Sequence, residues 1–223
     1  LKTNSGKLPV IIKGTKFPKP ITYLENKGSA QCKSSIMLAA LNTKGTTFIK
    51  AKKSRDHTEI LFKYLKLPIK IKRSLIHDTI EIKGGNKIKP LNYKIPSDIS
   101  SSAFFIVLTA LSKKSKLKIK NININPTRIG VLRILKKMGI KIYLKNKRIY
   151  KGEKIADLHV FSVSKIKPIN CPVSLNSAAI DEFLLIFLVA ATERGWRFLR
   201  SFLNPFSSIK DFNNSSSTTL LES

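Results

Sequence analysis

The sequence predicts an α/β fold assembled from a repeated unit of one β-sheet and two helices. Short runs of apolar and β-branched residues alternate with longer segments in which apolar residues recur at helical spacing. Two stretches, 54–71 and 125–142, share one pattern at an offset of about 71 residues, and each ends in an Ile-Lys-Ile strand. A sheet needs helices on one face to close its hydrophobic core, and both stretches supply them.

The first half of the chain is expected to contain two helices. Ser29 is a favoured N-cap residue before an apolar run, so we expect a helix over 30–41, broken by Gly45. A second helix is expected over 56–65, where Asp56 precedes Glu59 at the spacing of a capping box. The expected strands are 8–12, 21–24, 46–49, 69–71 and 79–82.

The same order recurs in the second half. A helix is expected over 100–111, with Asp98 and Ser100 as candidate caps, and another over 126–138, which begins with a proline. A third copy is expected to begin with a strand at 158–163 and a helix over 178–191. The other expected strands are 91–95, 117–120, 140–143 and 148–150, the last two on either side of Asn146.

Net charge is the most unusual feature of the composition. The 223 residues include 42 Lys and Arg against 13 Asp and Glu, a formal net charge of +29. Such an excess is typical of proteins that bind nucleic acid. The basic residues are scattered, however, and Lys, Ile and Asn share A/T-rich codons, so genomic base composition explains the excess equally well. We therefore expect no nucleic-acid partner.

Little in the composition indicates a metal, disulfide or membrane protein. Cys32 and Cys171 form neither a disulfide framework nor a metal motif, and the three histidines lack ligand spacing. The longest apolar run, 183–191, is too short to span a bilayer, and no signal peptide is recognisable. These features predict a cytoplasmic protein without a bound metal.

Several motifs together resemble the EPSP synthase (3-phosphoshikimate 1-carboxyvinyltransferase) family, and most of all its class II, glyphosate-insensitive branch. The motifs follow the family's order with near-family spacing, and the resemblance covers about residues 5–191 as a fragment of the family chain. They are Ser29–Asn42 with Gly45–Thr47, Ser54–Glu59, Ile95–Phe104, Asn125–Gly130 and Ile180–Phe183.

The resemblance implies an architecture. The family folds each of two globular domains from three sheet-plus-two-helix units, an inside-out α/β barrel that would be incomplete here. We expect residues 1–95 to belong to the first domain and 96–193 to the second. Residues 194–223 depart from the family pattern and are expected to be a disordered or frame-shifted tail.

The resemblance also implies a reaction. The family transfers the enolpyruvyl group of phosphoenolpyruvate to the 5-hydroxyl of shikimate 3-phosphate, in the shikimate pathway to aromatic amino acids. It needs no cofactor, and its full-length members are expected to be monomers without a nucleic-acid or membrane partner. Because both substrates are anions, the site needs fixed cations and hydrogen-bond donors, with a base for the hydroxyl.

The predicted substrate-binding residues are Ser29, Ala30, Gln31 and Arg55. The first three match the family's Ser-Ala-Gln, whose serine binds the phosphate and whose glutamine lies between the substrates. They also begin a helix, where unpaired N–H groups suit an anion, and Lys33 is expected to add another donor. Arg55 matches the arginine of Ser-Arg-Asp-His-Thr-Glu and suits a phosphate or carboxylate. An ordinary helix cap is the competing interpretation of Ser29.

Asp181 is the predicted catalytic base, because it matches the aspartate of the family's Asp-Glu-Tyr/Phe segment. The apolar residues that follow it predict burial of its carboxylate. A helix N-cap is the competing interpretation, and Leu184 stands where the family usually has proline. Structural roles are expected for the remaining polar residues of the motifs, with Arg128 pairing with an acid: His57, Glu59, Asp98, Ser101, Ser102 and Thr127.

Several blocks of the family pattern are missing, among them the glycine loop that holds phosphoenolpyruvate. We therefore expect no useful activity from this chain alone. Three alternatives stay open at this point. They are a relative of the enzyme that acts on UDP-N-acetylglucosamine, a basic nucleic-acid-binding module, and a scaffold that binds no ligand.

Overall fold

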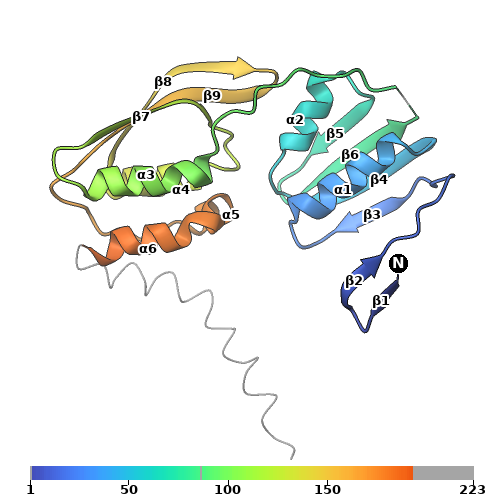
Figure 1. Cartoon of the computed structure of the whole chain (residues 1–223), viewed down its shortest axis with the longest axis horizontal. Helices are drawn as coiled ribbons and strands as arrows, with labels where there is room; N and C mark the ends of the chain where they lie inside the picture. Colours follow the sequence, from blue (N-terminus) through green and yellow to red (C-terminus); the bar gives the residue numbers. More distant parts are fainter. Residues whose placement is uncertain (1, 86, 193–223) are drawn as a thin grey trace, which may run out of the picture. The chain divides into compact units, whose positions relative to one another are not determined.

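The computed structural model describes residues 2–85 and 87–192, and it divides into two compact units. Unit 1 ends at Asn92, and unit 2 begins at Tyr93. Each unit combines helices with a β-sheet of its own (Figure 1). The α/β class predicted from the sequence is therefore confirmed, and the units are described one at a time.

Unit 1 is built on a four-stranded sheet with the order β3-β4-β6-β5, in which only the β3–β4 pair is parallel. Alternate residues of β4 and β6 are buried, so one face of the sheet carries the core. Helices α1 and α2 pack against this sheet (Figure 1). The elements are β3 (Thr22–Glu25), α1 (Ala30–Leu41), β4 (Gly45–Lys52), α2 (His57–Tyr64), β5 (Ile69–Arg73) and β6 (His77–Gly84), preceded by the hairpin β1 (Lys2–Asn4) and β2 (Lys7–Ile11).

Unit 2 repeats this plan with a three-stranded antiparallel sheet of order β7-β9-β8. This order matches β4-β6-β5 of unit 1. In both units one helix precedes the first of these three strands in the sequence, and a second helix connects that strand to the next one in the sequence. The elements are α3 (Ile99–Leu111), β7 (Lys116–Asn123), α4 (Gly130–Lys137), β8 (Lys141–Tyr150) and β9 (Glu153–Phe161). A helical run follows: η1 (Val173–Leu175), α5 (Asn176–Ala179), η2 (Ile180–Glu182) and α6 (Phe183–Ala191).

The cores of the two units are separate clusters. In unit 1 the cluster is Met37, Ala40, Leu41, Ile49, Ala51, Phe62, Ile80 and Ile82. In unit 2 it is larger, because the helices after β9 add their apolar residues, including Ile186 and Val189. The repeated units predicted from the sequence therefore each close a core of their own.

Three of the predicted strands need correction. Residues 91–95 form no strand, and only an isolated parallel bridge joins Ser97 to Ile122 where unit 1 has β3 beside β4. Pro96 has no N–H to donate, and Lys94 donates its own to the Tyr150 hydroxyl at 3.2 Å. The two strands expected around Asn146 are one strand, β8, with a register shift at this point. Asn146 has a φ of 49° and bonds the Asp157 carboxylate, so it forms a bulge.

The helices largely follow the prediction, with three differences. The helix expected over 126–138 begins only at Gly130, because residues 126–128 form a turn in which the Asn125 side chain accepts the Thr127 N–H at 2.9 Å. Asp56 precedes α2 but makes no capping hydrogen bond, because its carboxylate pairs with Arg73 at 2.8 Å. The single helix expected over 178–191 is divided into short segments, and α6 begins only at Phe183.

The helical run from Val173 to Ala191 is long and apolar enough to cross a membrane, with a third of it buried. Residues 183–191 alone are too short to span a bilayer, but the whole helical run is not. One such helix is weak evidence for a membrane protein, because core helices pass the same test.

Candidate functional site

The first turn of α1 carries three of the predicted binding residues. Ser29 is the N-cap, and its hydroxyl accepts a hydrogen bond from the Cys32 N–H at 3.2 Å, as the cap prediction requires. Ala30 is half-buried, and the side chain of Gln31 is exposed, with Oε1 3.5 Å from the Ser29 hydroxyl. This turn therefore presents a polar side chain beside a positive helix end.

Glu25, at the end of β3, holds the loop that leads into α1. Its buried carboxylate accepts hydrogen bonds from the N–H groups of Lys27 at 2.8 Å and Gly28 at 2.7 Å. Burial alone would raise the pKa of Glu25, but these backbone bonds, one from Ser29 and the Lys33 ammonium together hold it below its ordinary value. The loop before Ser29 is thus fixed by an ionised side chain.

Lys33 lies one turn after Ser29, and its side chain is buried rather than offered to a ligand. Its ammonium lies 2.6 Å from the Glu59 carboxylate, and both side chains are only 2% exposed. It also donates a hydrogen bond to the Arg55 carbonyl at 2.9 Å. The expectation that Lys33 is an additional ligand donor is therefore wrong.

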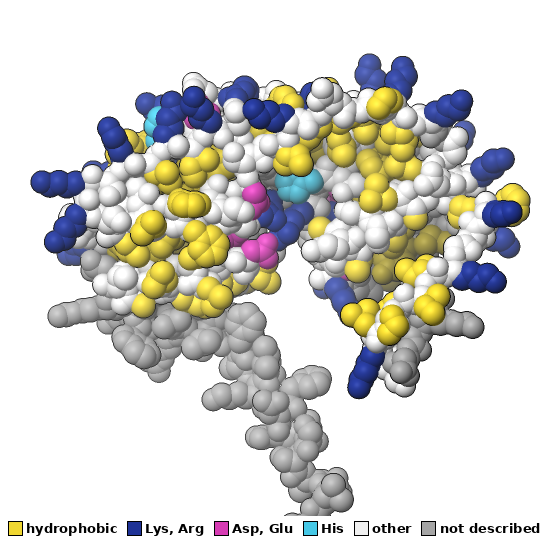
Figure 2. Space-filling model, viewed as in Figure 1, with side chains coloured by type: hydrophobic (Ala, Val, Ile, Leu, Met, Phe, Trp, Pro, Cys, Tyr) yellow, Lys and Arg dark blue, Asp and Glu magenta, His cyan; other side chains and the backbone are white. Residues whose placement is uncertain are grey.

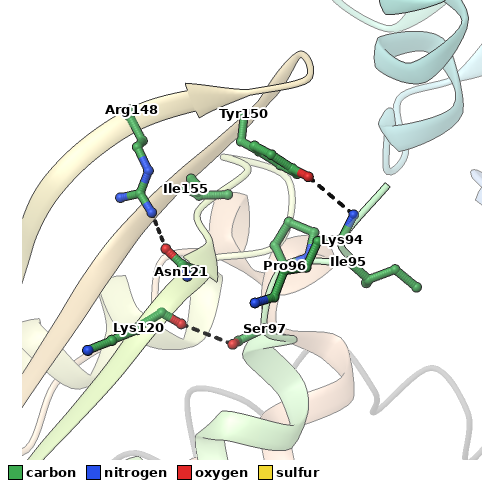
Figure 3. A pocket seen from close by; sticks show the side chains of 9 residues that line it. All are labelled: Lys94, Ile95, Pro96, Ser97, Lys120, Asn121, Arg148, Tyr150 and Ile155. Carbon is green, nitrogen blue, oxygen red and sulfur yellow. Dashed lines mark hydrogen bonds between the residues drawn. The ribbon is translucent and has the colours of Figure 1, made fainter. Parts of the chain in front are cut away.

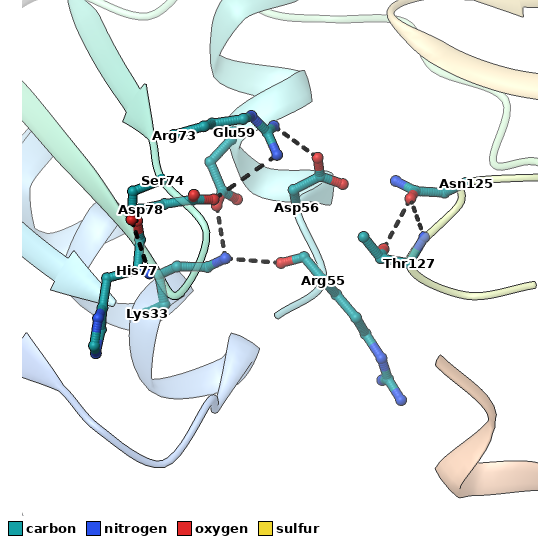
Figure 4. A network of polar contacts seen from close by, with 10 residues as sticks. All are labelled: Lys33, Arg55, Asp56, Glu59, Arg73, Ser74, His77, Asp78, Asn125 and Thr127. Carbon is teal, nitrogen blue, oxygen red and sulfur yellow. Dashed lines mark hydrogen bonds and ion pairs between the residues drawn. The ribbon is translucent and has the colours of Figure 1, made fainter. Parts of the chain in front are cut away.

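Arg55 directly precedes α2, and its guanidinium points away from the Lys33–Glu59 pair (Figure 4). Ser34 and Thr58 link the first turns of α1 and α2 a second time, since their hydroxyls lie 2.7 Å apart. The structure therefore brings the backbone of Arg55 next to the turn that begins at Ser29. We call the four residues Ser29, Ala30, Gln31 and Arg55 the candidate binding corner of unit 1.

The corresponding corner of unit 2 is filled by its own acids. Asp98 caps α3 by accepting the Ser101 N–H at 2.8 Å, and Arg128 donates to it at 3.1 Å. Arg128 also contacts the Ser100 hydroxyl at 2.5 Å, and that hydroxyl reaches the buried carboxylate of Glu182. Burial would raise the pKa of Asp98, but the bonds from Ser101 and the charge of Arg128 lower it overall.

Asp181 belongs to this corner of unit 2. Its carboxylate lies 3.7 Å from the Arg128 guanidinium, and its side chain is 44% exposed. The burial expected from the following apolar run is therefore not found, because that run packs inward only from Phe183 onward. The N-cap of α6 is Glu182, and Asp181 lies in the turn before it.

A separate pocket of about 420 Å³ lies in unit 2, between the 94–97 segment and the sheet (Figure 3). Tyr150 and Ile155 form part of its wall, and Arg148 is held there by the Asn121 side chain. None of the predicted site residues lines it. Within the described residues, no group of three or more His, Cys, Asp or Glu side chains is placed to hold a metal ion.

Comparison with known proteins identifies the family. The family model described as EPSP synthase (3-phosphoshikimate 1-carboxyvinyltransferase) matches residues 1–202. The chain belongs to the EPSP synthase family.

Individual members of the EPSP synthase family give the same result. The 3-phosphoshikimate 1-carboxyvinyltransferase of Legionella pneumophila (strain Lens) is 41% identical over 194 residues, which are 86% of this chain and 44% of that protein. The one from Ruthia magnifica is 40% identical over 87% of this chain. A solved EPSP synthase from Acinetobacter baumannii superimposes with a TM-score of 0.74 and 38% identity, covering 86% of this chain and 42% of its own. The chain thus spans less than half the length of these relatives.

The buried Lys33–Glu59 ion pair beside the candidate binding corner of unit 1 was not predicted from the sequence. The spacing of apolar residues in α1 nevertheless indicates it. Lys33 is spaced four, seven and eight residues before Met37, Ala40 and Leu41, the buried positions of α1, so helical periodicity places it on the core face. A lysine on that face needs a buried acid, and Glu59 is the only acidic residue within α2.

Proposed function

We propose that this chain carries the shikimate 3-phosphate corner of an enolpyruvyl transferase. The full-length protein would transfer the enolpyruvyl group of phosphoenolpyruvate to the 5-hydroxyl of shikimate 3-phosphate, with phosphate as leaving group and no cofactor. The single observation that carries the proposal is the tie between the α1 start and the Arg55 backbone, through Lys33. Family membership adds to it.

The residues of this corner suit a phosphate or carboxylate. A guanidinium binds either group through two parallel hydrogen bonds, and a helix start adds N–H donors and a positive dipole end. Fixed donors of this kind offset the repulsion between two anionic substrates better than mobile ones do. We assign Ser29, Ala30, Gln31 and Arg55 to substrate binding.

We assign the role of base to Asp181 in unit 2. Its carboxylate is accessible, and Arg128 at 3.7 Å helps to orient it. A carboxylate can accept the proton that the 5-hydroxyl loses when it attacks the enolpyruvyl carbon. We also propose that unit 1 and unit 2 are parts of the first and second globular domains of the family.

The proposal includes a cytoplasmic, monomeric protein that binds neither nucleic acid nor membrane. On the face drawn in Figure 2, the Lys and Arg side chains are dispersed among other residues and do not form one continuous patch. The apolar run 173–191 contributes Ile186, Val189 and Ala190 to the core of unit 2, which is a sufficient reason for its composition.

Titration of the ¹⁵N-labelled chain with shikimate 3-phosphate tests the binding assignment. We expect amide shifts at Ser29, Gln31 and Arg55, with weaker shifts for shikimate or inorganic phosphate alone. Arg55→Ala should weaken binding by about tenfold to a hundredfold, since hydrogen bonds to charged groups contribute about 1.5–3 kcal/mol.

Arg133→Ala is the control, because it removes a guanidinium from an exposed position on α4 to which the proposal assigns no role. It should leave the affinity unchanged. Equal affinity of Arg55→Ala and the parent would contradict the proposal. So would preferential binding of a single-stranded oligonucleotide with steep salt dependence.

A further inference from the structure

We infer that Lys33 is a positioning residue that fixes Arg55 against the first turn of α1. Its ammonium would hold the Arg55 backbone so that the guanidinium and the donors of Ser29 and Gln31 act on one anion. The inference rests on the proposed function of the corner. It assigns a role in ligand binding to a side chain that cannot itself touch the ligand.

Lys33 makes hydrogen bonds at the starts of both α1 and α2. Its backbone N–H donates to the Ser29 carbonyl at 3.1 Å, within the first turn of α1. Its ammonium donates to the Arg55 carbonyl at 2.9 Å and pairs with Glu59 at 2.6 Å, both at the start of α2 (Figure 4). Lys33 therefore joins the two residues, through its backbone N–H to Ser29, which caps α1, and through its side chain to Arg55, which carries the guanidinium.

Stability is a weak explanation for this buried pair. Removing two charges from water costs free energy that their attraction barely repays, and apolar side chains of similar volume often replace such a pair without loss. The second Glu59 oxygen, Oε2, is buried without a hydrogen-bond partner, which adds to the cost. Because the pair adds little stability, its better explanation is that it fixes the position of the Arg55 backbone beside the start of α1.

Unit 2 shows that the fold does not require the pair. Counting from the N-caps, Lys33 is the fourth residue of α1 and corresponds to Ser102 of α3. Glu59 is the third residue of α2 and corresponds to Leu132 of α4, which is 2% exposed. The same two helices thus pack in unit 2 with a serine and a leucine at these positions. Only unit 1 has an ammonium there, and it donates a hydrogen bond to the carbonyl of Arg55.

The double variant Lys33→Met/Glu59→Leu tests the inference, because it removes both charges together and roughly conserves volume. The Ser34–Thr58 hydrogen bond remains to join the two helices. We expect an unchanged urea midpoint but about tenfold weaker binding of shikimate 3-phosphate, since Arg55 loses its anchored backbone.

Two comparisons separate positioning from stability. Met37→Ala, on the same helix and fully buried, should lower the urea midpoint but leave the affinity of the folded chain unchanged. In an Arg55→Ala background the double variant should cause no further loss of affinity, because Lys33 then has no guanidinium to position.

A ligand-free measurement tests the inference independently of the proposed function. The ¹³C carbonyl shift of Arg55 should change in the double variant and not in Met37→Ala. An unchanged shift, unchanged affinity, or a tenfold loss that persists without the Arg55 side chain would overturn the inference. A changed shift in a chain whose parent does not bind shikimate 3-phosphate would instead overturn the proposed function.

Discussion

The corners of unit 1 and unit 2 use the same elements but differ in the polar contacts that their side chains make. In both, an arginine stands directly before the N-cap of the second helix: Arg55 before Asp56, and Arg128 before Ile129. Arg128 is occupied by Asp98 and Asp181. The guanidinium of Arg55 points away from the acids that neighbour its backbone (Figure 4). A repeated position therefore does not imply a repeated role.

The cap residue of the first helix accounts for much of this difference. In unit 1 the cap is Ser29, a neutral donor and acceptor, which adds no charge to the positive helix end. In unit 2 the cap is Asp98, which supplies an anion of its own to both the helix end and Arg128. One side chain thus gives the helix start of unit 2 an ion pair that a serine cap cannot make.

The largest expected effect concerns the second helices of the two units. Gly130 begins α4 in contact with α5, and a Cβ there would lie 2.5 Å from the Ala178 carbonyl carbon. Gly130→Ala must therefore push two backbones apart, and it should lower the free energy of unfolding by about 3 kcal/mol. His57 begins α2 at the corresponding place with a Cβ already present, so His57→Ala introduces no such clash and should cost clearly less than Gly130→Ala.

Urea unfolding of both variants, followed by circular dichroism, checks this prediction. Equal midpoints for Gly130→Ala and the parent would show that α4 and α5 do not approach as closely as described. If His57→Ala lowered the free energy of unfolding as much as Gly130→Ala, the clash with Ala178 would not be what distinguishes the two helix starts.

The next effect concerns the cap of the binding corner. Ser29→Asp should give unit 1 the cap of unit 2, and the new carboxylate would compete with a ligand for the helix end and Arg55. We expect shikimate 3-phosphate to bind at least about tenfold more weakly at unchanged or slightly higher stability, since aspartate is as good a cap as serine. Ser29→Asn, a cap without charge, is the control for titration by calorimetry. If the two variants bind equally, charge at the cap does not distinguish the corners.

The sequence was sufficient for the elements whose signals are local. Ser29 and Asp98 cap helices as predicted, because a short polar side chain can bond only the N–H groups that follow it. Signals that depend on distant partners failed. Asp56 pairs with Arg73, seventeen residues later, instead of capping α2. The 91–95 segment forms no strand, and Lys94 donates its N–H to the hydroxyl of Tyr150, which is distant in the sequence, rather than to a neighbouring strand.

The binding corner was predictable only in part, for the same reason. The motifs located Ser29 and Arg55, but their link depends on the direction of Lys33, which only packing reveals. Asp181 was expected to be buried because apolar residues follow it in sequence. Its exposure depends on where α6 begins, and the cap there is Glu182, whose side chain makes no capping hydrogen bond that would mark the start in the sequence.

The smallest expected effect is a difference in pH dependence between the two caps. The pKa of Asp98 is lowered in the folded state, so its ionised form stabilises unit 2 above the pKa of an unfolded aspartate. This contribution is lost as pH falls through the folded pKa. Asp98→Asn keeps a cap of similar quality and the carboxylate is half exposed, so the variant should cost less than about 1 kcal/mol at pH 7, and the difference from the parent should shrink in acid. Ser29→Ala removes a cap that does not titrate, so its cost should persist at every pH. Urea midpoints measured from pH 7 down to pH 3 distinguish the two, and parallel curves for both variants would show that Asp98 does not act through its charge.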